Sequence, residues 1–172
     1  VMSIGSNFQE SLQKAICSME DDKHGLEKII DDNESINQKL GFELTFPGPE
    51  RLFFIADAFR CGWSLEKIFD LTSIDPWFLR QIEDLVSEEN AIQGSKLENL
   101  SKENLERLKI KGFSDQRIAD LLDESYEEVR SKRKSHNILP SYKRVDTCAA
   151  EFKTSTCYMS VSYTHLRAHE TC

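Results

Sequence analysis

Long hydrophobic runs are missing from this 172-residue sequence. No stretch approaches the about 20 consecutive apolar residues that a membrane-spanning helix needs, and no basic-then-apolar leader opens the chain. We therefore expect no membrane partner. Basic residues are also outnumbered by acidic ones, which gives a formal net charge of −8. That balance argues against a protein whose whole surface binds nucleic acid.

The residues that usually carry chemistry are scarce. Only seven glycines occur, and neither a P-loop nor a G-x-G-x-x-G phosphate cradle is present. The five cysteines are scattered and form no C-x-x-C pair, which indicates reduced thiols in a cytoplasmic compartment. His24 and His136 cannot be tied to a serine or cysteine nucleophile. The sequence therefore predicts no catalytic, cofactor-binding or metal-binding residue.

Helix start and stop signals are what the sequence has in abundance. Asn7 and Glu10 have the spacing of a capping pair, and Asp75-Pro76 marks another helix start. We predict an all-α fold, an irregular multihelical array of at least six short helices. A stray strand at the N-terminus and an extended or disordered C-terminal tail would accompany it. Further capping residues are expected at Ser64, Ser101, Ser114 and Ser125.

Two weaker elements are also expected. A short helical stretch covers Leu26 to Leu40 and is ended by Gly41. The opening residues Val1–Gly5 look like the end of a buried strand. A strand alone cannot satisfy its backbone hydrogen bonds, so we expect its partner strands upstream and the chain to be a piece of a larger protein.

The segment from Gly112 to Ile138 resembles a helix-turn-helix. In a DNA-binding protein the second helix would lie in the major groove. The alternative is two packed helices with basic residues near a helix C-terminus, where the helix dipole favours cations. We favour packing and keep a small DNA-binding protein as the alternative function. The basic residues expected to face outward are Arg130, Lys132, Arg133 and Lys134.

Other candidate sites are weaker still. His165 and His169 would share a helix face near Cys157 and Cys172, but zinc ligands usually have tighter spacing. The pairs Glu88-Glu89 and Glu127-Glu128 are sequence neighbours, which do not face each other on a helix. We expect a solvated face there rather than an acid/base dyad.

Aromatic residues are dense in one third of the chain. Most should lie in the core, and those left over would suit a subunit interface, where aromatic side chains are enriched. The residues concerned are Phe53, Phe54, Phe59, Trp63, Phe69, Trp77 and Phe78.

Four longer strings occur in order: Ile55–Gly62 (IADAFRCG), Leu71–Leu79 (LTSIDPWFL), Lys111–Asp115 (KGFSD) and Pro140–Phe152 (PSYKRVDTCAAEF). Together they closely resemble the large chain of carbamoyl phosphate synthetases. The opening residues, with Glu10–Ala15 (ESLQKA), look like the end of the first ATP-grasp half of that chain. The similarity is colinear from Val1 to about Met159.

The resemblance implies a function that the residues alone do not. The family's enzyme is a cytoplasmic ligase that makes carbamoyl phosphate from bicarbonate, glutamine-derived ammonia and ATP, for arginine and pyrimidine biosynthesis. Its large chain has two ATP-grasp halves, which bind ATP and Mg or Mn, joined by a helical oligomerisation domain. The implied partners are these flanking halves, a glutaminase small subunit and further copies of the chain, but no nucleic acid. No catalytic residue carries over, so this fragment alone is expected to be inactive.

The resemblance also predicts the domain limits. Residues 1–20 would end the first ATP-grasp half, residues 21–145 would form the helical oligomerisation domain, and residues 146–159 would begin the linker to the second half. Residues 160–172 resemble translated sequencing adapter, and we expect a non-native tail there. Ser6 stands where the family usually has Arg.

Overall fold

The fold is built around one long central helix, α5. The computed structural model describes residues 1–30, 35–148, 151–152 and 156–163. The elements of this part are α1 (Phe8–Cys17), α2 (Ile36–Thr45), α3 (Arg51–Arg60), α4 (Leu65–Thr72), α5 (Pro76–Ile92), the 3-10 turn η1 (Leu97–Asn99), α6 (Lys102–Ile110), α7 (Asp115–Leu122), α8 (Tyr126–Ser135), β1 (Ser141–Arg144) and β2 (Met159–Ser162). This confirms the predicted all-α class with many short helices.

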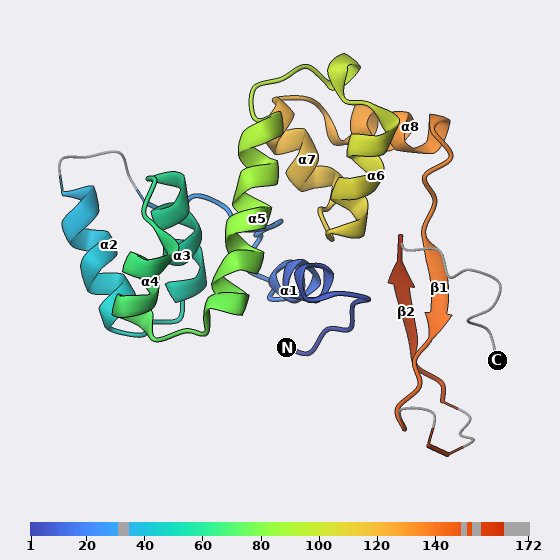
Figure 1. The fold of residues 1–172 in the computed structure, drawn as a ribbon. Helices are drawn as coiled ribbons and strands as arrows, with labels where there is room; N and C mark the ends of the chain where they lie inside the picture. Colours follow the sequence, from blue (N-terminus) through green and yellow to red (C-terminus); the bar gives the residue numbers. More distant parts are fainter. Residues whose placement is uncertain (31–34, 149–150, 153–155, 164–172) are drawn as a thin grey trace.

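Two helical lobes flank α5 (Figure 1). Helices α2, α3 and α4 form one lobe, and α6, α7 and α8 form the other. Helix α1 packs against α5 on the side of the second lobe, and the two-stranded sheet lies at the edge beyond it. None of the described helices combines the length and apolar character that a membrane span would need.

Side-chain caps begin the helices where the sequence predicts. The Asn7 side chain accepts a hydrogen bond from the backbone N–H of Glu10 at 2.8 Å. Ser125 and Glu128 complete a reciprocal capping box at the start of α8. Such caps satisfy backbone donors that the first helical turn leaves unpaired. The other confirmed capping residues are Ser64, Asp75, Ser101 and Ser114.

The helix predicted over Leu26–Leu40 is wrong in its extent. Helix α2 begins at Ile36, runs through Gly41 and ends at Thr45, just before Pro47. Residues 31–34 lie outside the described part of the chain. Residues 24–30, which we call the strap, are not helical.

Tertiary hydrogen bonds explain why the strap is not a helix. The backbone N–H groups of Ile29 and Ile30 donate to one carboxylate oxygen of Asp57, at 3.0 and 2.9 Å. The carbonyl of Leu26 accepts from Arg60 and from Arg117. These side chains occupy the backbone groups that a helix would use, and they outweigh a weak local helix propensity.

A continuous core runs through both lobes and along α5. Apolar side chains of the two lobes pack on opposite sides of the central helix, so the three parts share buried surface. Side chains with no more than 1% exposure lie in every part of it: Leu26, Leu40, Leu44, Ile55, Ile68, Leu79, Leu85, Leu105, Leu108, Phe113 and Ile118.

The chain ends differ in part from expectation. The strand expected at Val1–Gly5 is absent, because the sheet of the described residues pairs only β1 with β2, antiparallel, from Ser141 opposite Ser162 to Arg144 opposite Met159. The opening segment is held instead by Lys14, whose Nζ donates to the Ile4 carbonyl at 3.0 Å. The extended backbone expected after Pro140 is confirmed at β1 and β2. Residues 164–172 lie outside the described part.

Candidate functional site

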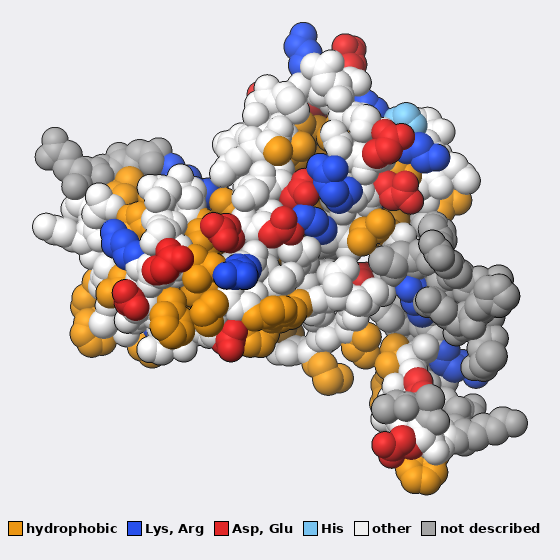
Figure 2. All heavy atoms as spheres, viewed as in Figure 1, with side chains coloured by type: hydrophobic (Ala, Val, Ile, Leu, Met, Phe, Trp, Pro, Cys, Tyr) orange, Lys and Arg blue, Asp and Glu red, His pale blue; other side chains and the backbone are white. Residues whose placement is uncertain are grey.

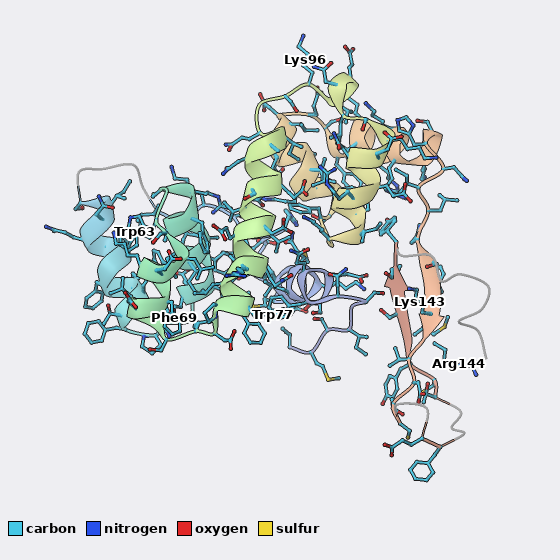
Figure 3. All side chains as sticks on the ribbon, viewed as in Figure 1. Trp63, Phe69, Trp77, Lys96, Lys143 and Arg144 are labelled. Carbon is cyan, nitrogen blue, oxygen red and sulfur yellow. The ribbon has the colours of Figure 1, made fainter. Side chains whose placement is uncertain are left out.

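Exposed aromatic side chains gather along one edge of the first lobe and α5. Figure 2 shows apolar side chains along this edge, and Figure 3 places Phe69 and Trp77 on it. Phe42 on α2 and Phe46, which follows this helix directly, are 61% and 59% exposed, with ring centroids 4.9 Å apart. We call Phe42, Phe46, Phe69, Trp77 and Phe78 the aromatic band; its α4 and α5 members are 39–52% exposed.

The start of α5 fixes one end of the aromatic band. Asp75-Pro76 sets the first helical turn, so Trp77 and Phe78 point outward while Leu79 is fully buried. Phe8 of α1 packs edge-on against both exposed rings, with centroids 5.4 and 5.2 Å away. Edge-to-face pairs of this kind are favourable, so the rings are held in place without being covered.

The other predicted aromatics lie deeper. Phe53 and Phe54 are 3% and 4% exposed, and Phe59 and Trp63 are partly buried against the core. The prediction that most of the seven aromatics lie in the core is therefore wrong, because two are buried, two are partly buried, and Phe69, Trp77 and Phe78 are exposed. The leftover set has the composition of a protein–protein contact surface.

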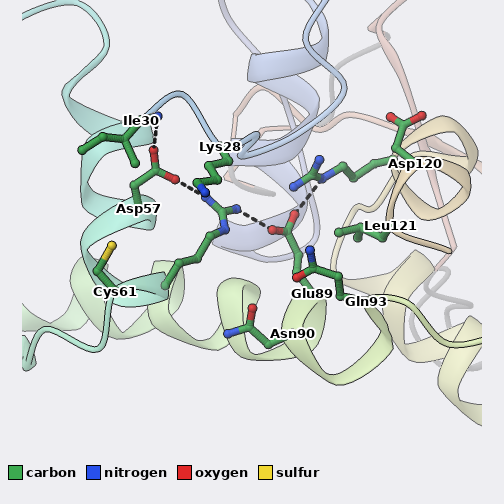
Figure 4. Close-up of a pocket in the computed structure, with 11 residues that line it drawn as sticks. Lys28, Ile30, Asp57, Cys61, Glu89, Asn90, Gln93, Asp120 and Leu121 are labelled. Carbon is green, nitrogen blue, oxygen red and sulfur yellow. Dashed lines mark hydrogen bonds and ion pairs between the residues drawn. The ribbon is translucent and has the colours of Figure 1, made fainter. Parts of the chain in front are cut away.

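Four charged side chains meet between α3, α5 and α7 (Figure 4). Arg60 donates to Asp57 at 2.7 Å and to Glu89 at 2.5 Å, and Arg117 Nε donates to the other oxygen of Glu89 at 2.8 Å. The Asp57 and Glu89 side chains are 1% and 2% exposed. We call these four residues the bridging cluster, because they join both lobes to α5 and to the strap.

A cavity of about 380 Å³ opens onto the bridging cluster. Lys28 and Asp120 add one charge of each sign to its lining, so the formal charges of the six ionisable Lys, Arg, Asp and Glu side chains cancel. Both buried carboxylates already have arginine partners. Neither is therefore free to act as a general base in this arrangement, in which ion pairs join α3, α5 and α7.

Sequence reasoning missed the bridging cluster. Its members come from three helices and follow no motif. The signal was present only as charge at inward positions: Asp57 lies inside the apolar run IADAF, and Arg117 precedes the buried pair Ile118-Ala119. A buried charge at such positions requires a partner, but the sequence does not name it.

The helix-turn-helix geometry of α7 and α8 is present, but its basic face is largely occupied. Arg133 was expected to face outward and is instead 7% exposed, with its Nε 2.9 Å from Asp115 Oδ2. Lys132 donates to the carbonyls of Leu97 and Glu98. Of the four basic residues expected outward, Lys134 is exposed, Arg130 and Lys132 are half-buried, and Arg133 is buried. No observation supports the DNA-binding alternative.

The structure does not bring the predicted metal-site residues together in the part of the chain that it describes. His165, His169 and Cys172 lie outside the described residues, and Cys157 is exposed. Within the described ranges, no three or more His, Cys, Asp or Glu side chains are grouped to hold a metal ion.

The adjacent carboxylates point to different partners. Burial favours a raised pKa for Glu88, but its hydrogen bonds and ion pairs with Arg107 and Lys111 outweigh burial and hold that pKa below its usual range. Glu89 belongs to the bridging cluster, and Glu127 is exposed. The solvated face predicted at Glu88-Glu89 is therefore wrong, because both side chains are ion-paired and only 13% and 2% exposed. Glu127 and Glu128 are exposed as predicted.

Comparisons with known proteins agree with this helical architecture. Residues 1–137 match the family model described as the carbamoyl-phosphate synthetase large chain, oligomerisation domain. The chain is 50% identical over 163 residues to a carbamoyl phosphate synthase large chain of Neisseria meningitidis serogroup A, and 48% identical over 164 residues to those of Pseudomonas aeruginosa and Vibrio cholerae. These alignments cover 95% of this chain but 15% of each relative. The chain therefore belongs to the family of carbamoyl-phosphate synthetase large-chain oligomerisation domains.

Proposed function

We propose that this chain is a structural and oligomerisation piece of a carbamoyl phosphate synthetase large subunit, without catalysis of its own. The parent ligase would join bicarbonate, glutamine-derived ammonia and ATP, for arginine and pyrimidine biosynthesis in the cytoplasm. ATP and its metal ions would bind in flanking ATP-grasp halves. The aligned region is only 15% of each relative, so the relatives are six to seven times longer than this chain and have room for such halves.

The aromatic band is the observation that carries the oligomerisation role. Five aromatic side chains remain 39–61% exposed along one edge, although the protein has a well-filled core to receive apolar groups. Large exposed apolar groups that gather on one edge favour an interaction site in a soluble protein. We assign the band to contact with a second copy of the chain, and a glutaminase small subunit would be a further partner of the parent enzyme.

The domain limits remain part of the proposal. Residues 1–20 would attach the first ATP-grasp half, residues 21–145 would form the helical domain, and residues 146–159 would lead to the second half. The packing of α1 against α5 supports an attachment role for the first segment. Gln9 Nε2 on α1 donates to Asp84 Oδ2 on α5 at 2.7 Å, so the two helices are also joined by a part-buried polar contact.

Sedimentation velocity at increasing concentration tests the oligomerisation role. The unaltered chain is expected to self-associate, and a Phe42→Ser/Phe46→Ser variant is expected to lose this association while keeping its helical circular dichroism. Leu139→Ser is the matched control, because Leu139 is 45% exposed and lies beyond α8, outside the band. A strictly monomeric unaltered chain, or equal association of all three proteins, would contradict the assignment.

The surrounding reading frame tests the assignment to a larger ligase. An ATP-grasp half is expected on each side of the segment encoding these residues. A short isolated frame with its own start codon would contradict the proposal, whatever the sedimentation result.

A further inference from the structure

The extended segment Met159–Tyr163 lies against the helical part of the protein. Strand β2 pairs with β1 on one side, and Ser162 is only 2% exposed. Tyr163 packs against the core as a partly buried side chain. The segment directly follows Tyr158, so it is the path that the chain takes as it leaves the helical domain.

Two carbonyl groups of this segment accept hydrogen bonds from side chains of the helical part and of β1. Lys14 Nζ on α1 donates to the Val161 carbonyl at 2.5 Å and pairs with Glu10 at 2.9 Å. Ser141 Oγ donates to the Ser162 carbonyl at 3.0 Å. Carbonyl groups are common to every residue type, so these contacts tolerate many sequences.

The Tyr163 side chain contacts the buried cations, while the Ser160 hydroxyl lies 3.4 Å from Lys14 Nζ and donates to the Ile4 carbonyl at 3.2 Å. The Tyr163 ring centroid lies 4.8 Å from Lys109 Nζ and 5.4 Å from Arg133 Cζ. Both distances are within the range of cation–π attraction, which is strongest where the cation is desolvated. The side chains of Lys109 and Arg133 are 5% and 8% exposed. Burial raises the pKa of the Tyr163 phenol, which keeps the ring neutral.

The cationic receptor is held in place by the helices themselves. Lys109 Nζ pairs with Asp115 Oδ1 at 2.8 Å, and Arg133 Nε pairs with Asp115 Oδ2 at 2.9 Å. Two cations thus share one carboxylate, which leaves one positive charge in excess within this buried trio. The negative face of an aromatic ring complements that excess without adding a second buried ion.

Space remains beside the ring. A largely apolar cavity of about 230 Å³ is lined by Tyr163, Val161, Phe113 and Cys17 together with Lys109. The site around the Tyr163 ring therefore suits an aromatic side chain and has unfilled space beside it.

We propose that Lys14 and the Lys109–Asp115–Arg133 trio form a docking groove for the extended stretch that directly follows Tyr158 in the same chain, with an aromatic side chain at position 163 as its anchor. All four groove residues lie within residues 1–137, which the family model matches. The groove thus belongs to the helical domain, and it would fix the path of residues 159–163 in this chain, of which 160–163 fall in the tail expected to be non-native. Lys14 binds the carbonyl of Val161, so this contact does not depend on the side chain at position 161.

Hydrogen exchange of the whole chain tests the groove. Tyr163→Ala is expected to reduce amide protection in β1 and β2 by about tenfold or more, with α1–α5 unchanged, because local opening is governed by local contacts. Tyr163→Phe should keep the protection, because the ring and not the hydroxyl faces the cations. Tyr163→Leu should lose most of it, since leucine has volume but no ring.

Tyr158→Ala is the matched control, because that side chain is 62% exposed and borders the same sheet. Its protection pattern should equal that of the unaltered chain. Unchanged protection in Tyr163→Ala, or equal protection in the Leu and Phe variants, would overturn the proposal. Sedimentation tests self-association through the aromatic band, whereas hydrogen exchange tests the groove. Failure of one proposal therefore does not decide the other.

Discussion

Arg60 and Glu89 meet across the contact of α3 and α5, with Nη2 2.5 Å from Oε2. The second oxygen of the same carboxylate accepts from Arg117 on α7. One carboxylate that is 2% exposed therefore connects both helical lobes through the central helix. Both arginines also bind the Leu26 carbonyl, so the strap is held at the same point.

Glu89→Gln should destabilise the protein strongly. It removes the charge shared by two guanidinium groups and leaves Asp57 as the nearest anion to only one of them. Removing one partner from a buried ion pair costs about 3–5 kcal/mol in the free energy of unfolding. Urea denaturation measures this loss. Glu83→Gln on the same helix is the control, because Glu83 is partly exposed and forms no ion pair with a described residue; a loss of equal size there would contradict the argument.

Gln13→Met should stabilise the protein, which is an unusual direction for a buried substitution. Gln13 is 1% exposed, and both polar atoms of its amide lack a hydrogen-bond partner among the described residues. An unpaired buried polar group costs about 1–3 kcal/mol, and methionine has a similar shape without that cost. The gain should appear as a higher urea midpoint.

Gln9→Met provides the opposite case on the same helix. The Gln9 amide is also buried, at 8% exposure, but its Nε2 donates to Asp84 Oδ2 and to the Gln81 carbonyl. This substitution should lower the urea midpoint. If both substitutions shifted the midpoint in the same direction, hydrogen-bond satisfaction would not be the deciding factor.

Local signals predicted where helices begin, because capping is a local interaction. Ser125 and Glu128 are three residues apart and interact as soon as the helix forms. The same logic failed over Leu26–Leu40. There the outcome depended on Asp57, Arg60 and Arg117, which lie 27 to 91 residues from the backbone groups they bind. Local helix propensity cannot include such partners.

The sequence also could not show which aromatic side chains are exposed and which are buried, because that depends on tertiary packing. Phe53 and Phe69 both lie in apolar helical patterns, yet one is 3% exposed and the other 39%. Which face of α4 is covered depends on where α2 and α5 lie. Arg133 shows the same limit, since its outward placement was expected from a basic run and its burial follows from Asp115 on the neighbouring helix.

Gly112 and Gly62 form a matched pair for testing backbone constraint. Both have positive φ, +92° and +77°, which costs a non-glycine residue roughly 1–2 kcal/mol. A Cβ on Gly112 would also lie 2.7 Å from Glu10 Cα, whereas a Cβ on Gly62 would meet nothing within 4 Å. Gly62→Ala should therefore cost only about 1 kcal/mol in the free energy of unfolding.

Gly112→Ala should cost clearly more, by about a further 1–3 kcal/mol, because α1 must move to relieve the contact. Thermal denaturation of both variants measures the difference. Equal losses would mean that α1 shifts away without cost, contrary to its packing against α5 in this structure.

The stability of the fold should fall in acid through Asp115. Burial of this carboxyl alone would raise its pKa, but the charges and hydrogen bonds of Lys109 and Arg133 outweigh burial and hold the pKa below its usual range. The ionised carboxylate therefore stabilises the folded state at pH values above the ordinary aspartate pKa. That contribution is lost as pH falls through the depressed folded-state pKa.

Asp115→Asn should separate this effect from general acid denaturation. At neutral pH the variant should lose about 3 kcal/mol or more in the free energy of unfolding, because Lys109 and Arg133 remain buried without their anion. As pH falls, the unaltered protein loses stability through Asp115 and the variant does not, so the two urea midpoints should converge. Asp120→Asn is the control, since that exposed carboxylate accepts from Gln116 alone among the described residues and should give a small difference that does not change with pH. A constant gap between Asp115→Asn and the unaltered protein would show that the trio stabilises the fold through packing rather than through charge.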